Sequence, residues 1–362
     1  MKLLVFGLSV SSSWGNGHAT LWRGLAAALA RRGDSLVFLE RDRPWYAAAR
    51  DLTALPAPGQ LILYSDWAEA VAAARPRLAD ADAVVVTSYC PDGVAATELV
   101  LTEARGRRLF YDLDTPVTLA RLAAGEDLDY IGPRGLADFD LVLSYTGGWA
   151  PDLLRERLGA RRVVPFYGHV DPEIHRPSRP APQYRCDLSY IGTFAADRQE
   201  GLQRLFIDAA RDRPAGRFCI AGALYPPDFP WADNIFFVRH LPPGEHPGFF
   251  AASRLTLNVT RTAMSAAGWC PSGRLFEAAA CGCPVLTDGW EGLDRFFTPG
   301  EEILVACDTA DTLAALDQDD RILRRIGEAA RARVLADHTA AVRAEQLRAL
   351  LSDPPAPRPS GA

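Results

Sequence analysis

Short apolar runs alternate with amphipathic segments along this 362-residue chain, and that alternation constrains the fold more than any other feature. The runs in the first half are almost continuously apolar, which is typical of strands buried on both faces of a parallel sheet. The segments between them carry apolar residues at helical spacing. We predict strands at 2–8, 35–40, 60–64, 83–87, 108–112 and 141–144, and helices at 18–32, 66–79, 92–105 and 149–158.

The alternation stops at a proline-rich crossing near residue 178 and then begins again. The second half predicts strands at 187–192, 217–221, 235–238, 255–259, 284–287 and 303–305, with helices at 198–210, at 247–252 and directly after Ser272. Three helical segments follow, at about 309–317, 319–336 and 338–351. The repeated pattern predicts an α/β protein with two Rossmann-like, doubly wound domains facing across a cleft.

Four parts of the chain follow from this pattern. We place the N-terminal domain at 1–178 and the C-terminal domain at 179–337. A C-terminal helix at 338–353 is expected to pack back on the N-terminal domain, and a disordered tail is expected at 354–362. Ligands bind at the carboxyl ends of strands in such sheets, so the residues that follow each strand are the candidates for a functional site.

The composition excludes several classes of function. The net charge of −6 gives no sign of a nucleic-acid partner, and no apolar run is long enough for a transmembrane segment. The seven cysteines form no CxxC pair, which favours a reducing cytoplasm and argues against a zinc site. Lys2 is the only lysine, so a phosphate-binding lysine loop is absent. Any phosphate must therefore be bound by arginines, hydroxyls and backbone amides.

The segment 272–288 is the most informative stretch, because it predicts a helix that turns sharply into a buried strand. Ser272 can cap the helix, and the free amides at a helix start suit a phosphate. Arg274 and Glu277 are three residues apart, on one side of the first turn. Arg274 could bind a diphosphate and Glu277 two ribose hydroxyls, as a nucleotide-sugar site requires. The alternative is a surface Arg–Glu pair on an ordinary buried helix.

Other strand ends in the second half carry similar groups. Gly192 and Thr193 could offer amides and a hydroxyl to a phosphate, and Arg198 could supply charge. Arg261 follows another strand. His240 could contact the base or the sugar, although a histidine that only completes its loop is an equal alternative.

The first strand is followed by a glycine-containing loop in which Gly15 and Gly17 permit a tight turn. His18, at the start of the next helix, could act as a general base on an incoming hydroxyl, or it could only shape the turn. Trp14 and Tyr89 could stack on an acceptor, or they could be packing. Glu40 occupies the place of a ribose-binding acid, which keeps a nicotinamide-dependent enzyme as a rival.

Two carboxylates follow the fifth strand, at Asp112 and Asp114. Their spacing is that of a metal-binding DxD motif, but the doubly wound pattern argues against that role. Asp114 could cap the helix that Pro116 begins. Alternatively, either carboxylate could orient His18 or bind acceptor hydroxyls.

Taken jointly, the segments 14–20, 112–119, 190–193, 257–261 and 272–288 resemble those of glycosyltransferases with two Rossmann domains, the GT-B architecture, and in particular the CgeB-like, spore-maturation-protein-like family. The resemblance implies that Glu277 holds the donor ribose and that Arg198 contacts the diphosphate. The chain departs from the large retaining families, because Thr193 stands where they carry arginine and Trp269 where they carry a first glutamate. The resemblance therefore leaves inversion or retention undecided.

The resulting hypothesis is a metal-independent Leloir glycosyltransferase that needs no cofactor and uses a nucleoside-diphosphate sugar, with UDP expected as the nucleotide. The C-terminal domain would bind the donor, and the N-terminal domain a small-molecule, glycan or lipid-linked acceptor. Rivals are a sugar-nucleotide epimerase and a non-catalytic sugar-nucleotide or glycan-binding protein. The predicted catalytic residues are His18, Asp112 and Asp114; the acceptor-binding residues are Trp14, Gly15, Asn16, Gly17 and Tyr89; the donor-binding residues are Gly192, Thr193, Arg198, His240, Asn258, Arg261, Ser272, Gly273, Arg274, Leu275 and Glu277.

Overall fold

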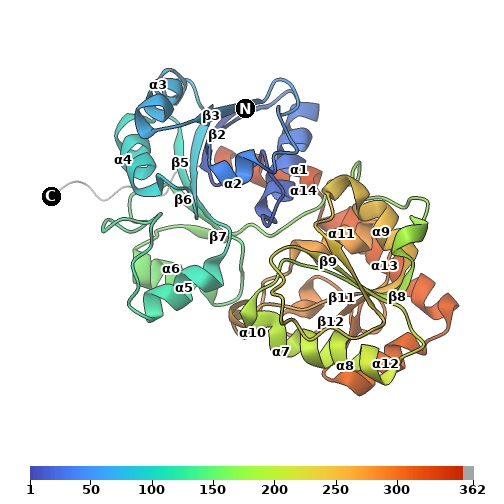
Figure 1. Cartoon of the computed structure of the whole chain (residues 1–362). Helices are drawn as coiled ribbons and strands as arrows, with labels where there is room; N and C mark the ends of the chain where they lie inside the picture. The colour runs from blue at the N-terminus through green and yellow to red at the C-terminus, as the bar shows by residue number, and fades with distance from the viewer. Residues whose placement is uncertain (354–362) are drawn as a thin grey trace. The chain divides into compact units, whose positions relative to one another are not determined.

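The computed structural model describes residues 1–353, and the predicted tail at 354–362 lies outside the described residues. The chain divides into two compact units (Figure 1). Unit 1 is Met1–Tyr167 together with the segment that begins at Ala340, and unit 2 is Gly168–Thr339. The first boundary lies at Tyr167 rather than near residue 178 because the segment after Tyr167 bonds to unit 2, where the amide of Val170 donates to the carbonyl of His338 at 3.0 Å.

Unit 1 contains a seven-stranded sheet in which every neighbouring pair is parallel. Its strand order is β3-β2-β1-β4-β5-β6-β7, so the chain moves outward from β1 and then reverses at β4. All five residues of β4 are buried, as expected for a central strand with helices on both faces. The strands are β1 (Lys2–Gly7), β2 (Ser35–Arg41), β3 (Gln60–Tyr64), β4 (Ala83–Thr87), β5 (Arg107–Asp112), β6 (Leu141–Ser144) and β7 (Val163–Pro165).

The helices of unit 1 connect these strands, and one of them comes from the end of the chain. That last helix, α14, packs beside α1, as the red and blue helices of Figure 1 show. Arg32 and Glu345 pair across this contact at 3.0 Å, and Arg348 pairs with Asp34 at 2.6 Å. The helices are α1 (His18–Arg31), α2 (Pro44–Ala47), α3 (Trp67–Leu78), α4 (Gly93–Glu103), α5 (Thr115–Ala123), α6 (Ala150–Leu158) and α14 (Ala340–Ser352).

Unit 2 repeats the same plan with a six-stranded parallel sheet of order β10-β9-β8-β11-β12-β13. The reversal of strand order now falls between β8 and β11. The strands are β8 (Cys186–Ile191), β9 (Phe218–Gly222), β10 (Ile235–Arg239), β11 (Ser253–Asn258), β12 (Val285–Thr287) and β13 (Leu304–Val305).

The helix predicted at 198–210 is a helical run from Ala196 to Asp212 that contains a short π segment at Gln203–Ile207. The helix predicted after Ser272 is α11, which ends where Gly282 adopts φ +77. The α-helices of unit 2 are α7 (Gln199–Leu202), α8 (Asp208–Asp212), α9 (His246–Ala252), α10 (Thr262–Ala267), α11 (Gly273–Ala280), α12 (Thr309–Leu316) and α13 (Asp320–Asp337). Throughout residues 1–353, no helix combines the length and the apolar composition needed to cross a membrane.

Both units agree with the predicted α/β class, and their topology determines where a site can form. In a parallel sheet the loops after all strands gather at one edge, and the reversal of strand order opens a crevice there. In unit 1 the reversal is flanked by the loops after β1 and β4. In unit 2 it is flanked by the loops after β8 and β11, and α11 begins at the same edge because it leads into β12.

Gly222, at the end of β9, tests how tightly the strand ends of unit 2 are packed. A methyl group at this position would lie 1.9 Å from the carbonyl oxygen of Gly192, which belongs to the backbone and cannot rotate away. We expect Gly222→Ala to lower the free energy of unfolding by about 1–3 kcal/mol, measured by urea denaturation.

Gly244→Ala is the matched control, because nothing lies within 4 Å of the added methyl group. A change of no more than about 0.5 kcal/mol is expected there. Equal stability of the two variants would contradict this description of the β8–β9 edge.

Candidate functional site

The loop after β8 holds the first group of predicted donor-binding residues. Arg198 donates from Nη2 to the carbonyl of Thr193 at 2.7 Å, and the hydroxyl of Tyr225 donates to the carbonyl of Gly192 at 3.0 Å. The Nε of Arg198 is buried without a hydrogen-bond partner among the described residues. This arginine therefore closes the loop while one of its donors stays unused.

The end of β11 comes to the same loop. Arg261 donates from Nε to Asp197 Oδ2 at 2.9 Å. Asp197 is the residue directly before Arg198, so this bond brings Arg261 to the loop that contains Arg198. Two predicted arginines from segments more than sixty residues apart are thus brought together. Asp197, which binds Arg261 and directly precedes Arg198, was missed by the sequence analysis because an acidic residue in a turn carries no specific signal.

Two predicted donor-binding residues, Asn258 and Leu275, use polar groups inside the fold, and their contacts with a donor stay predictions. Asn258 is buried, and its amide donates to Thr287 Oγ1 at 3.0 Å, which ties β11 to β12. Leu275 is 0% exposed, and its backbone amide donates to the carbonyl of Ser272 at 3.0 Å. Both residues hold the framework of the site.

The first turn of α11 has the predicted cap. The side chain of Ser272 accepts a hydrogen bond from the amide of Arg274 at 3.3 Å, and Gly273 is the first helical residue. Arg274 donates from Nη1 to Glu277 Oε2, so the two residues do lie on one side of the turn. Glu277 is only 5% exposed, which excludes the alternative of an ordinary surface pair.

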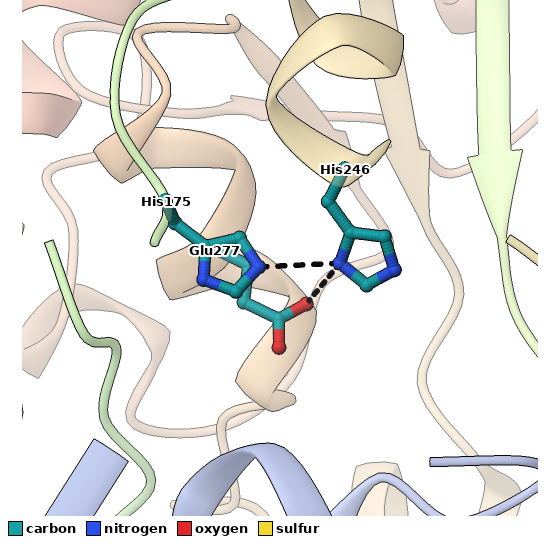
Figure 2. Close-up of side chains that lie close together, drawn as sticks. All are labelled: His175, His246 and Glu277. Atoms are coloured by element: carbon teal, nitrogen blue, oxygen red, sulfur yellow. Dashed lines mark hydrogen bonds and ion pairs between the residues drawn. The ribbon is translucent and has the colours of Figure 1, made fainter. Parts of the chain in front are cut away.

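Two buried histidines complete this arrangement (Figure 2). His246, the first residue of α9, lies with Nδ1 3.1 Å from Arg274 Nη1 and 3.6 Å from Glu277 Oε2. His175, from the crossing before β8, lies with Nε2 3.2 Å from His246 Nδ1. The sequence analysis missed both histidines. No local pattern marks them, because their positions depend on segments 71 residues apart.

The charges in this cluster are unequal. Burial by itself raises the pKa of Glu277, but Arg274 and the two histidines outweigh burial, so its pKa lies below the ordinary value. Burial lowers the pKa of His175 to about 4, and burial and then Arg274 lower the pKa of His246. At neutral pH the cluster is an ionised carboxylate, one guanidinium and two neutral imidazoles.

Two further residues near this end of unit 2 make separate contacts. His240 follows β10 with φ +63, and its amide donates to the carbonyl of Gly222 at 3.0 Å. Among the described residues, no contact joins it to Arg274 or Glu277. Trp269 has φ +50 and covers Gly292, where an added methyl group would lie 2.4 Å from its ring.

In unit 1, the loop after β1 is held by its own polar groups. Asn16 is buried; its amide donates to the carbonyl of Ser9 at 3.0 Å, and its side-chain oxygen accepts from the amide of His18 at 3.1 Å. The loop therefore uses both ends of the Asn16 side chain, and the predicted contact of Asn16 with an acceptor stays a prediction. Gly15, by contrast, is exposed with φ +60, Gly17 is exposed, and Trp14 is half-buried.

Glu40 has a structural role in the same loop. Its carboxylate accepts from the Ser9 hydroxyl at 2.9 Å, from the amides of Val10 and Ser11 at 2.7 and 2.9 Å, and from the Ser11 hydroxyl at 2.6 Å. These four donors occupy the carboxylate, so it is not available to a ribose. The observation that supported a nicotinamide-dependent enzyme is thereby removed.

His18, Tyr89 and Asp114 lie together at the edge of the unit 1 sheet. The rings of His18 and Tyr89 are 6.0 Å apart, and the hydroxyl of Tyr89 donates to Asp114 Oδ2 at 3.0 Å. Burial lowers the pKa of His18, and Asp114 opposes that effect. The side chain of Asp114 makes no capping bond to α5, so the capping interpretation is wrong.

Asp112 lies beneath this group and is 0% exposed. Its Oδ1 accepts from Thr118 Oγ1 at 3.0 Å and from the amide of Asp114 at 3.3 Å, while Oδ2 has no hydrogen-bond partner among the described residues. Burial raises the pKa of Asp112 to about 7, because no cation faces it as Arg274 faces Glu277.

Comparisons with known proteins agree with this architecture. Residues 198–349 match the family model described as glycosyl transferase-like. Among solved structures, sucrose-phosphate synthase from Thermosynechococcus elongatus superposes with a TM-score of 0.72 at 17% identity, covering 97% of this chain and 98% of that chain. Anabaena HepE in complex with UDP and glucose gives 0.68 at 13% identity, with coverage of 97% and 99%.

An α-glucosyltransferase in complex with UDP and a 13-mer DNA gives a TM-score of 0.67 at 12% identity, with coverage of 98% and 100%. A search among curated proteins finds no match. The likeness to these structures along the whole chain confirms the predicted GT-B fold. The fold is therefore that of the GT-B class, and its residues 198–349 match a glycosyl transferase-like model.

The buried carboxyl of Asp112 makes stability depend on pH. Its pKa is about 7 in the folded chain and about 3.9 in the unfolded chain. The free energy of unfolding of the wild-type protein therefore falls as the pH rises from about 3.9 to about 7, and this carboxyl has no such effect below about pH 3.9. Asp112→Asn cannot ionise. We expect the variant to gain about 2 kcal/mol relative to wild type between pH 5 and pH 8, measured by urea denaturation. A stability difference that is the same at both pH values would contradict this expectation.

Proposed function

We propose that this protein is a glycosyltransferase that transfers a sugar from a UDP-sugar to an acceptor hydroxyl, with unit 2 binding the donor and unit 1 the acceptor. The observation that carries the proposal is the first turn of α11, where an ionised, buried Glu277 lies beside Arg274 at a capped helix start. A carboxylate accepts hydrogen bonds from two vicinal ribose hydroxyls, and a helix start with an arginine attracts phosphate. HepE and the α-glucosyltransferase, which share the fold, were both solved in complex with UDP.

The diphosphate would bind to the groups that gather at the carboxyl edge of the unit 2 sheet. Gly192 and Thr193 offer the loop after β8, and Arg198, Arg261 and Arg274 supply positive charge. Arg198 and Arg274 each keep a buried Nε without a hydrogen-bond partner among the described residues, so each has a donor to give. Within the GT-B class, these residues support membership of the CgeB-like family.

In the proposed reaction the acceptor oxygen bonds to the anomeric carbon while the bond from that carbon to the diphosphate breaks. The acceptor proton passes to His18, whose lowered pKa keeps the imidazole neutral and able to accept it. The negative charge on the departing diphosphate is balanced by the three arginines and the amides of α11. Catalysis in this form needs no metal ion, because protein groups supply all the neutralising charge.

Glu277→Ala tests the donor site. The variant loses the carboxylate that would hold the ribose, so we expect UDP affinity in calorimetry to fall by at least about tenfold while the chain stays folded. Glu301→Ala is the matched control, because Glu301 is an exposed glutamate of the same unit. UDP binding that is unchanged in Glu277→Ala would refute the assignment of the donor site.

His18→Ala tests the general base. We expect UDP affinity to remain at the wild-type value and the rate of sugar transfer to fall by roughly 100- to 10,000-fold, which is the usual contribution of acid–base catalysis. Release of UDP from UDP-glucose with an acceptor panel gives the rate. Full turnover by the variant would show that His18 only shapes the turn.

A further inference from the structure

Three side-chain atoms of the types that bind transition metals converge in unit 2 (Figure 2). They belong to His175, His246 and Glu277; each residue offers one ligand atom, and these three atoms lie within 4.8 Å of one another. The three residues come from the crossing before β8, from the start of α9 and from α11. All three are buried, at 3%, 3% and 5% exposure.

Two of the three separations are close to those between neighbouring ligands of one zinc ion. Zinc binds histidine nitrogen at about 2.0–2.1 Å and carboxylate oxygen at about 2.0–2.2 Å, usually in tetrahedral geometry, which sets neighbouring ligand atoms about 3.4 Å apart. Here His175 Nε2 and His246 Nδ1 are 3.2 Å apart, and His246 Nδ1 and Glu277 Oε2 are 3.6 Å apart. Two histidines and one glutamate are also an established zinc donor set.

The hydrogen bond on the far side of His246 orients its ring for this role. His246 Nε2 lies 3.2 Å from the carbonyl of Leu241, which can only accept, so the ring proton belongs on Nε2. The lone pair of Nδ1 then points into the cluster. A backbone carbonyl that fixes the tautomer of a metal-ligating histidine is a recurrent second partner in metal sites. Among residues 1–353, Nδ1 of His175 is buried without a hydrogen-bond partner, so the ring proton can reside there and leave Nε2 free to ligate.

The guanidinium of Arg274 occupies the position to which these atoms converge. Arg274 Nη1 bonds to both His246 Nδ1 and Glu277 Oε2. The guanidinium is only partly held in place, because its Nε has no hydrogen-bond partner within the described part of the chain and 22% of the side chain is exposed. The guanidinium can therefore leave, and a divalent ion placed beside it would repel it.

We propose that His175, His246 and Glu277 form a Zn²⁺ site whose occupation alternates with that of the Arg274 guanidinium. The consequence for catalysis rests on the proposed function. Because Glu277 and Arg274 also belong to the proposed donor site, Zn²⁺ and UDP exclude each other, and Zn²⁺ acts as an inhibitor competitive with the donor.

The experiment measures Zn²⁺ binding to the full chain without nucleotide. All proteins carry Cys307→Ser, which removes the exposed thiol, and are freed of metal by dialysis against a chelator. Calorimetry should show one Zn²⁺ per chain. We expect His175→Asn and His246→Asn to weaken this binding by more than roughly 100-fold.

Arg274→Met gives a result that misfolding cannot imitate. Loss of the competing cation should tighten Zn²⁺ binding by at least about tenfold, whereas a damaged fold would weaken it. His18→Ala removes a histidine of unit 1 and should leave Zn²⁺ affinity unchanged. The proposal is overturned if the parent binds no Zn²⁺, if the two histidine variants bind it as the parent does, or if Arg274→Met binds it no more tightly.

A UDP titration with and without saturating Zn²⁺ separates this inference from the proposed function. Weaker apparent UDP affinity in the presence of Zn²⁺ supports mutual exclusion, and unchanged affinity overturns it. Metal-free protein that binds Zn²⁺ but not UDP would refute the donor site and leave the metal site standing. Protein that binds UDP but not Zn²⁺ would refute the metal site and leave the donor site standing.

Discussion

Burial of two parallel sheets on both faces is the constraint on which the rest of this protein depends. A strand covered by helices on each side must be apolar along its length, so polar groups are confined to the loops at its ends. Parallel pairing then brings all the carboxyl ends to one edge. In both units the strand order reverses once, and in unit 2 the start of α11 lies at the same edge as the loops after β8 and β11. The chemistry of the chain is thus concentrated by the packing of its core.

Two buried carboxyl groups show how local charge decides what such an edge can do. Glu277 and Asp112 are both almost entirely removed from water, and burial alone would raise the pKa of each. Arg274 reverses that effect for Glu277, whereas Asp112 faces only hydroxyls, an amide and the carboxyl of Asp114. One carboxylate stays ionised and can accept hydrogen bonds, and the other titrates near neutrality. The same residue chemistry therefore gives an anion in unit 2 and a neutral or ionised group in unit 1.

The cluster around Glu277 also couples several properties to one side chain. Arg274 keeps Glu277 charged, contributes to keeping His246 neutral, and blocks the point where the two histidines and the carboxylate converge. Displacement of this arginine would remove its positive charge from the cluster and open the converging atoms in one step. The donor site and the metal site proposed here are two uses of the same buried group.

The sequence by itself determined the fold class, most element positions and the helix start at Ser272. These depend on apolar periodicity and capping, which act within a few residues. It also predicted that Arg274 and Glu277 share one helical turn. Only the tertiary structure decided that Glu40, Asn16, Asn258 and Leu275 are framework residues, because their partners lie elsewhere along the chain or in the backbone. It likewise revealed His175 and His246, since their meeting with Glu277 depends on three segments that only the folding of the sheet brings together.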